Sequence, residues 1–453
     1  MERPDRIASS DAVPVARLAW LAGCLTTAAQ PARLAVGFVV ALLLWAPGLA
    51  WDAAVGPTID PPGLLAEPWE DLERAEAQAT MRRISAQLLP DVTFEGAQIP
   101  ADQLAAALAA RADDLADDPA AAERMRTAAR RVRALVPLGS FQALTGAEAE
   151  AWAAVIDGAR SLDPRPVVAG LGAAFIDVPR ACLARDTAFA AVFGAWTLLV
   201  AAIGFGAFAR MEAVHAAGRG MLEAGGALRF AAERWQALAM SWVGPVAVGV
   251  TVAIPVVAFG ALVRTDIGGW IGAVLYVVPM ALGAIAGLAF ILAVLGAPFG
   301  PAAVSADGLG GLEGSQRGAI YVLARPFSWL MVMAAAAGIV AIGLAILRTV
   351  GWALTLVPAV AVDLGSGGSS PLVSIASDPG RWWIPLDGRE ALVWGWVTVF
   401  SMLLSGACLS LVAGALTRAY LLLRESCDGQ PTDAVWPYEI PADVTDTLPP
   451  AST

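Results

Sequence analysis

Long apolar blocks alternate with polar segments along the chain. Six blocks contain no Asp, Glu, Arg, Lys or His, and they lie at residues 34–51, 187–209, 242–263, 270–297, 329–347 and 391–417. A helix needs roughly 20 apolar residues to cross the hydrocarbon core of a bilayer, and only helices and closed barrels satisfy their backbone groups there. The pattern therefore predicts an all-α, polytopic helical membrane protein with about six transmembrane helices.

The composition agrees with a membrane protein and argues against several other classes. Hydrophobic residues make up 58% of the chain and charged residues only 15%, whereas soluble domains are roughly half apolar and a quarter charged. The net charge of -11 lacks the basic footprint of a nucleic-acid-binding protein. The four cysteines are scattered, without the paired spacing of a metal site. We expect a lipid bilayer as partner, no nucleic acid, no cofactor and no metal.

The distribution of arginine predicts how the spans are oriented. Segments 1–33, 210–241, 298–328 and 418–453 carry 12 arginines, against four in 264–269 and 348–390. Short loops rich in Arg stay on the cytoplasmic side. We therefore predict a multi-pass protein of the cytoplasmic (inner) membrane with both ends in the cytoplasm and residues 52–186 outside it. The first span, 34–51, is predicted to be an uncleaved anchor.

Residues 52–186 form the long polar region between the first two predicted spans. Acidic residues and Pro68 open the stretch 67–89, and Asp118 precedes Pro119 as an N-cap precedes a first-turn proline. These signals predict an extracytoplasmic α-helical domain of about four Ala-rich helices. The apolar stretch 163–181 is bounded by Pro and Gly, and we interpret it as an interfacial re-entry segment before the second span.

The predicted cytoplasmic segments 210–241 and 298–328 share one pattern. Each is amphipathic and leads into a span through a Ser-Trp pair, Ser241-Trp242 in one and Ser328-Trp329 in the other. This predicts two copies of a surface helix followed by a helical hairpin, with the surface helices in the headgroup plane. Residues 1–33 are predicted to be cytoplasmic or interfacial, 348–390 an extracytoplasmic loop, and 418–453 a disordered acidic tail.

Three short motifs carry a resemblance to a known family. The stretches GFGAFARMEAVHAAG, LEGSQRGAIYVLARP and AYLLLRESCDG, within residues 204–218, 312–326 and 419–429, resemble marks of a family of bacterial polytopic inner-membrane proteins. The hairpin arrangement is also loosely similar to the membrane domain found beside some glycerophosphodiester phosphodiesterases. The resemblance implies a helical membrane fold, and it brings no catalytic residue with it.

The single histidine, His215, is the first residue to consider as part of an active site. It follows Glu212 by three residues, which places the two on one helix face, but a nucleophile or metal partner is missing from the pattern. We interpret His215 as a residue where a helix leaves the membrane, and we predict no catalytic residue. The candidate interaction residues in and near the motifs are Arg210, Glu212, His215, Arg234, Trp235, Arg317, Tyr321, Arg325, Arg424 and Asp428.

Small residues and prolines within the spans predict how the helices pack. Glycine and serine at four-residue spacing let helices approach closely. Pro255 and Pro279 fall inside consecutive predicted spans, where a proline removes a backbone donor and invites a kink. The predicted packing residues are Gly283, Gly287, Gly406, Ser410 and Gly414.

Three functional hypotheses follow from these observations. The first is a non-enzymatic scaffold that organises protein partners or the envelope, as a homo-oligomer or with other proteins. The second is a transporter or pore for a neutral or lipidic solute, based on the internal repeat and the two prolines. The third is a membrane enzyme of phospholipid metabolism, which rests only on the distant domain resemblance. The lack of charge within the predicted spans argues against a proton-coupled transporter.

Overall fold

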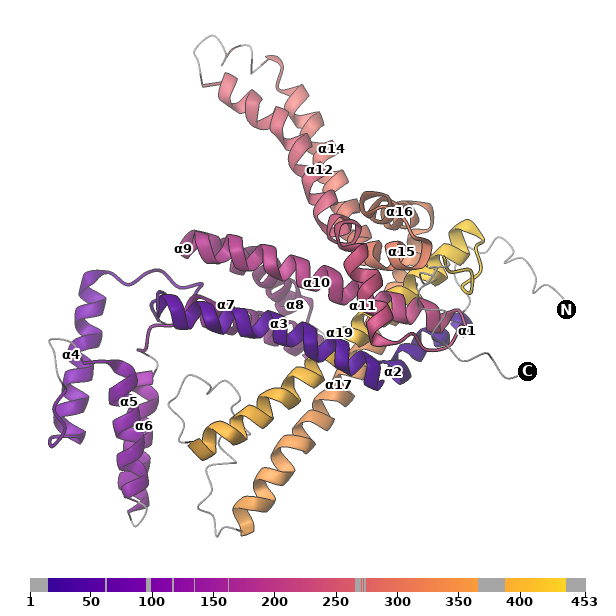
Figure 1. The fold of residues 1–453 in the computed structure, drawn as a ribbon. Helices are drawn as coiled ribbons and strands as arrows, with labels where there is room; N and C mark the ends of the chain where they lie inside the picture. The colour runs from indigo at the N-terminus through magenta and orange to yellow at the C-terminus, as the bar shows by residue number, and fades with distance from the viewer. Residues whose placement is uncertain are drawn as a thin grey trace. The chain divides into compact units, whose positions relative to one another are not determined.

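The computed structural model describes residues 15–436, with gaps at 62, 95–98, 116–117, 134, 162, 265–269, 271, 273 and 366–387. All regular elements in these residues are helices, apart from one isolated antiparallel bridge between Ile59 and Leu138 (Figure 1). Among them, seven helices are long and apolar enough to cross a membrane. The predicted all-α, multi-pass membrane fold is confirmed.

The chain divides into two compact units. Unit 1 comprises Met1–Ala41, Leu198–Leu354 and Val399–Thr453, and unit 2 comprises Leu42–Thr197 and Thr355–Thr398. Four long helices have residues in both units, and these are α3 (Pro31–Val55), α10 (Thr187–Ala216), α17 (Pro326–Gly365) and α19 (Gly388–Asp428).

Unit 1 gathers the ends of several spans around short connecting helices. Its apolar core includes Leu21, Phe299, Tyr321, Leu411 and Tyr420, which come from four different elements. Besides its parts of the four long helices, unit 1 contains α1 (Val15–Leu18), η1 (Ala19–Ala22), α2 (Gly23–Thr27), α11 (Ala224–Glu233), α12 (Trp235–Leu262), α14 (Val277–Gly296), η3 (Ala297–Phe299), α15 (Gly300–Asp307) and α16 (Gly311–Ala324).

Unit 2 is built from short helices around two apolar clusters. One cluster joins α4, α5 and α6 through residues such as Met81, Leu104 and Val132. The other surrounds Phe141, Val178 and Phe189 where α7, α9 and α10 meet. These helices are α4 (Asp71–Leu88), α5 (Ala101–Asp114), α6 (Pro119–Arg133), α7 (Ser140–Ser161), α8 (Pro164–Gly172), the π-helix η2 (Ala173–Asp177) and α9 (Val178–Arg185).

The seven long apolar helices include one more than the six predicted spans. Six of them contain the predicted blocks, and the seventh, Pro164–Arg185, comprises α8, η2 and α9. Its sequence includes Asp177, Arg180 and Arg185, so it did not stand out as an uncharged block. The structure therefore contains one long apolar helix that the pattern of uncharged blocks did not mark.

The predicted loop 348–390 does not begin where it was expected. The predicted loop 348–390 begins inside a helix, because α17 continues to Gly365. Arg348 ended the uncharged block, but arginine is a good helix former and does not end a helix. Of the remaining predicted loop, residues 366–387 lie outside the described residues.

The fourth predicted span begins later than expected. It was placed at 270–297, whereas α14 begins at Val277. Pro279 lies in the first turn of α14, where no backbone donor is needed, so it starts the helix rather than kinking it. In contrast, Pro245 and Pro255 both lie inside α12.

The segment 418–453 is more ordered at its start than predicted. Helix α19 continues to Asp428, and Gly429 then turns the chain with a left-handed φ of 68°. Val435 is 3% exposed in the apolar core of unit 1. Apolar and hydrogen-bonding contacts thus hold 429–436 in place despite the acidic composition, and 437–453 lie outside the described residues.

Candidate functional site

Charged residues at the span ends of unit 1 form two buried clusters. Arginines and carboxylates flank the apolar blocks in the sequence, because a charge is costly inside the bilayer. The folding of unit 1 brings these flanking residues together from distant parts of the chain. We call the first group the Glu212 cluster, which consists of Thr27, Arg33, Glu212 and Arg418, and the second the Asp307 cluster, which consists of Asp307, Arg317, Tyr420 and Arg424.

In the Glu212 cluster, one carboxylate binds two arginines. Arg33 Nη1 lies 2.6 Å from Glu212 Oε2, and the Nε of Arg418 donates to Oε1. The hydroxyl of Thr27 donates to Oε2 at 2.9 Å. Glu212 is fully buried, and the side chains of Arg33 and Arg418 are 1% and 6% exposed. Both carboxylate oxygens are therefore occupied by partners from three other helices.

Small residues make room for the Glu212 cluster. A Cβ at Gly414 would lie 3.3 Å from Glu212 Oε2, and one at Gly23 would lie 2.2 Å from Arg418 Nη1. Arg418 also donates to the carbonyl of Trp20 at 2.8 Å and lies over its ring at 4.7 Å. Burial, followed by the negative charge of Glu212, raises the pKa of the nearby Cys24 thiol to about 11. Cys24 is therefore a neutral packing residue at physiological pH.

The Asp307 cluster forms at the C-terminal end of α15. Gly308 ends this helix with a left-handed φ of 69°. One carboxylate oxygen of Asp307 accepts from Arg424, and the other accepts from Tyr420 and, at 3.0 Å, from Arg317. The side chain of Arg424 is 1% exposed and that of Asp307 is 9% exposed. As in the Glu212 cluster, two arginines share one carboxylate.

The chain after α19 continues the same site. We call residues 429–436 the C-terminal strap. The backbone N–H of Trp436 donates to the carbonyl of Ala306 at 2.7 Å. Arg210 donates to the carbonyls of Ser305 at 2.8 Å and of Trp436 at 3.2 Å. The last carbonyls of a helix have no partner within it, and here Arg210 and the strap supply partners for the end of α15.

Two further residues join this region, namely Arg234 between α11 and α12 and Tyr321 on α16. Arg234 donates to the carbonyl of Gly308 at 3.1 Å and lies 4.7 Å over the ring of Trp436. Tyr321 on α16 donates to Asp428 at 2.5 Å. Burial, followed by the hydrogen bond to Asp428, raises the pKa of the Tyr321 phenol well above its usual range. Tyr321 therefore acts as a neutral hydrogen-bond donor.

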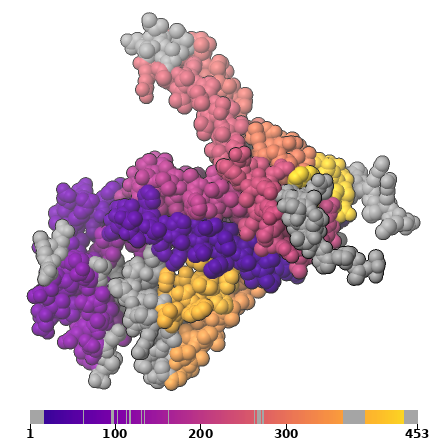
Figure 2. All heavy atoms as spheres, in the orientation of Figure 1, coloured from indigo at the N-terminus to yellow at the C-terminus, as the bar shows by residue number. Residues whose placement is uncertain are grey.

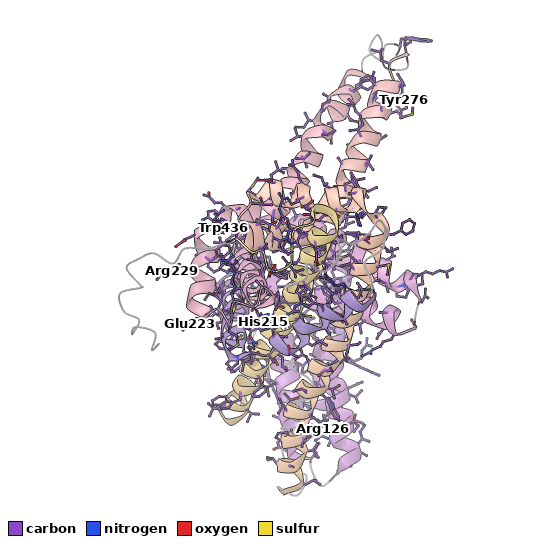
Figure 3. All side chains as sticks on the ribbon, turned by 90° about the vertical axis from the view of Figure 1, so that its right-hand side faces the viewer. Arg126, His215, Glu223, Arg229, Tyr276 and Trp436 are labelled. Carbon is purple, nitrogen blue, oxygen red and sulfur yellow. The ribbon has the colours of Figure 1, made fainter. Side chains whose placement is uncertain are left out.

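Most of the predicted interaction residues meet in this part of unit 1. The structure brings together Arg210, Glu212, Arg234, Arg317, Tyr321, Arg424 and Asp428, each with a partner named above. The other three predicted residues are His215, which is partly exposed near the end of α10 (Figure 3), Trp235, which is exposed, and Arg325, which is partly exposed. Within the described residues, the imidazole of His215 makes no hydrogen bond or ion pair. Whether any of the ten binds a partner stays a prediction.

Sequence reasoning missed several members of the two clusters. Thr27, Arg33, Asp307, Arg418 and Tyr420 were not among the predicted site residues. One signal was available, since Asp307-Gly308 and Asp428-Gly429 repeat the same pair at the ends of the two predicted repeats. In each pair, the glycine has a left-handed φ and ends a helix. The repeated Asp-Gly pair therefore marks the C-terminal ends of α15 and α19.

The predicted packing residues behave in two different ways. Gly406 lies against Gly37, where a Cβ on Gly37 would come within 2.3 Å of the Cα of Gly406. Ser410 is fully buried. In contrast, a Cβ on Gly283 or Gly287 would meet nothing within 4 Å, because both lie on an exposed face of α14. Gly283 and Gly287 therefore pack against no helix among the described residues, and whether they pack against a helix of another chain stays a prediction.

Two negative findings complete the description of the site. Across the part of the chain that the structure describes, no group of three or more His, Cys, Asp or Glu residues is placed to hold a metal ion. Comparisons of the sequence with protein-family models, with curated proteins and with solved structures gave no match.

Proposed function

We propose that this protein is a non-enzymatic scaffold of the cytoplasmic membrane that holds partner proteins, or further copies of itself, through an exposed helical hairpin. The observation that carries this proposal is the hairpin formed by α12 and α14. It stands away from the rest of unit 1 in all three views (Figure 1, Figure 2, Figure 3), and Figure 3 labels Tyr276 near its far end. Its exposed side chains include Val250, Val257, Ile285 and Ile291.

The exposed glycines of α14 add to this proposal. Gly283 and Gly287 are four residues apart and open to their surroundings. In membranes, such pairs allow the backbone of a second helix to approach closely. The partly buried positions Leu282, Ala286 and Ala289 lie on a different face of α14. The face with the glycines therefore remains available to a helix from another chain.

The two clusters support a structural rather than a catalytic role. A general base must offer its oxygen to a substrate proton within hydrogen-bonding reach. The oxygens of Glu212 and of Asp307 instead bind Arg, Thr and Tyr side chains of the same unit. These contacts fix helix ends against one another. A rigid base of this kind suits a protein that displays other surfaces to partners.

The proposed location follows from the arginines and from one ion pair. Arg17, which precedes the first span, pairs with Glu425 near the end of the last one at 2.7 Å. The same side of unit 1 contains Arg33, Arg210, Arg234 and Arg424. Since arginine-rich short segments remain in the cytoplasm, we place this side in the cytoplasm of a bacterial cell. The bacterial source and the inner membrane are part of this proposal.

The transport hypothesis loses part of its basis. It was built on an internal repeat and on two prolines inside consecutive spans, as in the broken helices of transporter sites. Pro279 begins α14 instead of interrupting it. Pro255 alone remains as an interior proline from that pair, so we favour the scaffold.

In-membrane crosslinking tests the proposal. Membranes containing the full chain would be treated with a lipid-soluble crosslinker and the masses of the products compared. We expect Gly283→Leu combined with Gly287→Leu to remove the higher-mass products. The matched control is Gly338→Leu on α17, where an added Cβ also meets nothing within 4 Å, and it should leave the products unchanged.

Two results would overturn the scaffold proposal. One is an unchanged set of crosslinked products in the Gly283→Leu, Gly287→Leu variant. The other is turnover of a phospholipid headgroup by the purified protein that is abolished by Glu212→Gln, since that would make the Glu212 cluster an active site.

A further inference from the structure

The seventh apolar helix poses a question that its composition alone does not answer. Pro164–Arg185 is long and apolar enough to cross a membrane. It precedes α10 by the single residue Asp186. It could therefore either cross the bilayer or lie along its surface, and the contacts of α3 and α10 distinguish the two.

Helices α3 and α10 run antiparallel along their whole lengths. Near the start of α3, Arg33 contacts Glu212, which lies near the end of α10. Near the end of α3, the ring of Trp51 lies 5.6 Å from that of Phe189, near the start of α10. Between them, Trp196 Nε1 donates to the carbonyl of Leu43 at 2.6 Å. The chain therefore leaves α3 and enters α10 on the same side of the membrane.

This arrangement fixes the number of crossings between the two helices. A chain that starts and ends on one side of a bilayer crosses it an even number of times. Between Val55 and Thr187, Pro164–Arg185 is the one described helix that is apolar and long enough to cross. A single crossing is odd, so this helix does not span the membrane.

The helix nevertheless leaves a large apolar face uncovered. One face packs on α7, where a Cβ on Gly170 would lie 2.6 Å from the carbonyl oxygen of Ala151. On the other, Val168 and Phe175 are each 69% exposed and Ile176 is 64% exposed. Phe175 packs edge-on against Trp152 at 5.9 Å. Trp152 and Ile156 are themselves exposed, so α7 extends the same apolar face.

The position of this face relative to a span identifies what covers it. Val178 and Cys182 on α9 are buried in one cluster with Phe189 on α10. Because Phe189 begins a transmembrane helix, this end of Pro164–Arg185 is held at the boundary of the bilayer. Arg165 and Arg180 are exposed near its two ends, where they can reach lipid phosphates. A helix with these features is suited to lie in the plane of the headgroups.

We propose that α8, η2 and α9, together with the exposed side of α7, form a lipid-binding surface that lies in the outer leaflet and holds the α4–α6 helices close to the membrane. The occupant is the phospholipid surface itself. This placement goes beyond the scaffold role and holds whether or not the hairpin binds partners, because it rests on the membrane position of α3 and α10. The assignment to the outer leaflet follows from the orientation proposed above.

Fluorescence quenching by lipids labelled at different depths tests this surface directly. The probe is the full chain without its native cysteines, in vesicles of phosphatidylcholine and phosphatidylglycerol. A fluorophore would be attached to a single cysteine at Phe175→Cys, at Val257→Cys on the α12 hairpin, or at Leu72→Cys on α4. All three side chains are largely exposed, so folding should tolerate the substitutions.

The expected pattern differs at the three positions. At 175, a spin label near the headgroup should quench more than one near the end of the acyl chain. At 257, the label near the end of the acyl chain should quench at least as strongly as the headgroup label. At 72, neither lipid label should quench, and only a water-soluble quencher should act. Stronger quenching at 175 by the deep label would mean a crossing. Absence of quenching by either lipid label at 175 would mean water or a protein partner, and either result overturns the proposal.

Labelling from one side of the membrane provides a second measurement. In sealed vesicles, Arg165→Cys and Arg180→Cys should both react with a membrane-impermeant maleimide added to the side that carries unit 2. Reaction of only one of the two from that side would show that the helix crosses. The crosslinking of the Gly283→Leu, Gly287→Leu variant is independent of this outcome, so failure of one proposal is distinguishable from failure of the other.

Discussion

The ion pairs of the two units use the same residue types in opposite surroundings. In unit 1, the side chains of Arg33 and Glu212 are 1% and 0% exposed. In unit 2, those of Arg160 and Asp157 are 61% and 73% exposed at an N–O distance of 3.4 Å. Breaking a buried pair leaves an uncompensated charge away from water. Breaking an exposed pair costs little, because water hydrates both charged groups once they separate. Burial therefore decides which pairs matter for folding.

The two sets of pairs also differ in what they connect. Arg160 and Asp157 are three residues apart on α7, and Arg111 and Asp114 have the same spacing on α5. Such pairs join neighbouring turns of one helix. Glu212 instead joins α2, α3, α10 and α19. The buried contacts of Glu212 therefore join helices that are far apart in the chain, whereas these exposed pairs of unit 2 join turns of a single helix.

The largest expected effect is at the centre of the Glu212 cluster. Glu212→Gln preserves the size of the side chain but leaves Arg33 and Arg418 buried without a counter-charge. We expect a loss of about 3–5 kcal/mol in the free energy of unfolding, measured by thermal or denaturant unfolding in detergent micelles. Asp157→Asn on α7 is the matched control and should change little. A loss below about 1 kcal/mol for Glu212→Gln would remove the distinction between the two units.

A smaller loss is expected at the Asp307 cluster, because Asp307 is less buried than Glu212. Asp307→Asn weakens the contacts to Arg317 and Arg424 and should cost about 2–3 kcal/mol. Tyr420→Phe removes one hydrogen bond to the same carboxylate and should cost about 1 kcal/mol. Unfolding in the same micelles would measure both. Equal losses for the two variants would mean that the charge of Asp307 adds nothing to its hydrogen bonds.

Release of the C-terminal strap should have a more local effect. Trp436→Ala removes the ring under Arg234 and should weaken the hold on residues 429–436 by about 1–2 kcal/mol. Limited proteolysis should then cut within 429–436 faster than in the wild type. Gln430→Ala, at an exposed position of the strap, serves as control. Unchanged cleavage in Trp436→Ala would show that Val435 and the backbone hydrogen bonds hold the strap without the ring.

The sequence could predict the features of the fold that contact with lipid requires. Lipid requires long uncharged helices, so the blocks at 34–51 and 187–209 could be assigned to α3 and α10 from composition alone. The ends of the helices were harder to predict. Arg348 marks the end of an uncharged block but not of α17, because the limit of lipid contact and the limit of a helix are different physical boundaries.

The pairing of charges could not be predicted in the same way. The sequence gives the same local signal for all the charged residues concerned. Each lies close to the end of an apolar block, and this holds for Arg33, Arg210, Arg418 and Glu212. The local sequence therefore does not indicate which of them form pairs. Which arginine meets Glu212 depends on which helix ends are neighbours. That is set by close contacts such as Gly37 against Gly406, between residues far apart in the chain. The residues at the site were therefore partly predictable, and the two clusters were not.

The smallest expected effect is at the exposed pair of α7. Arg160→Ala should change the free energy of unfolding by less than about 0.5 kcal/mol, because the pair lies in water and competes with hydration and dissolved salt. Unfolding measured at low and at high salt would test this, and the small difference should shrink further as salt increases. The Glu212 cluster is shielded from solvent, so the loss in Glu212→Gln should persist at high salt. A loss above about 1 kcal/mol for Arg160→Ala would mean that exposed pairs also stabilise unit 2. Burial would then not explain which ion pairs contribute to the free energy of unfolding.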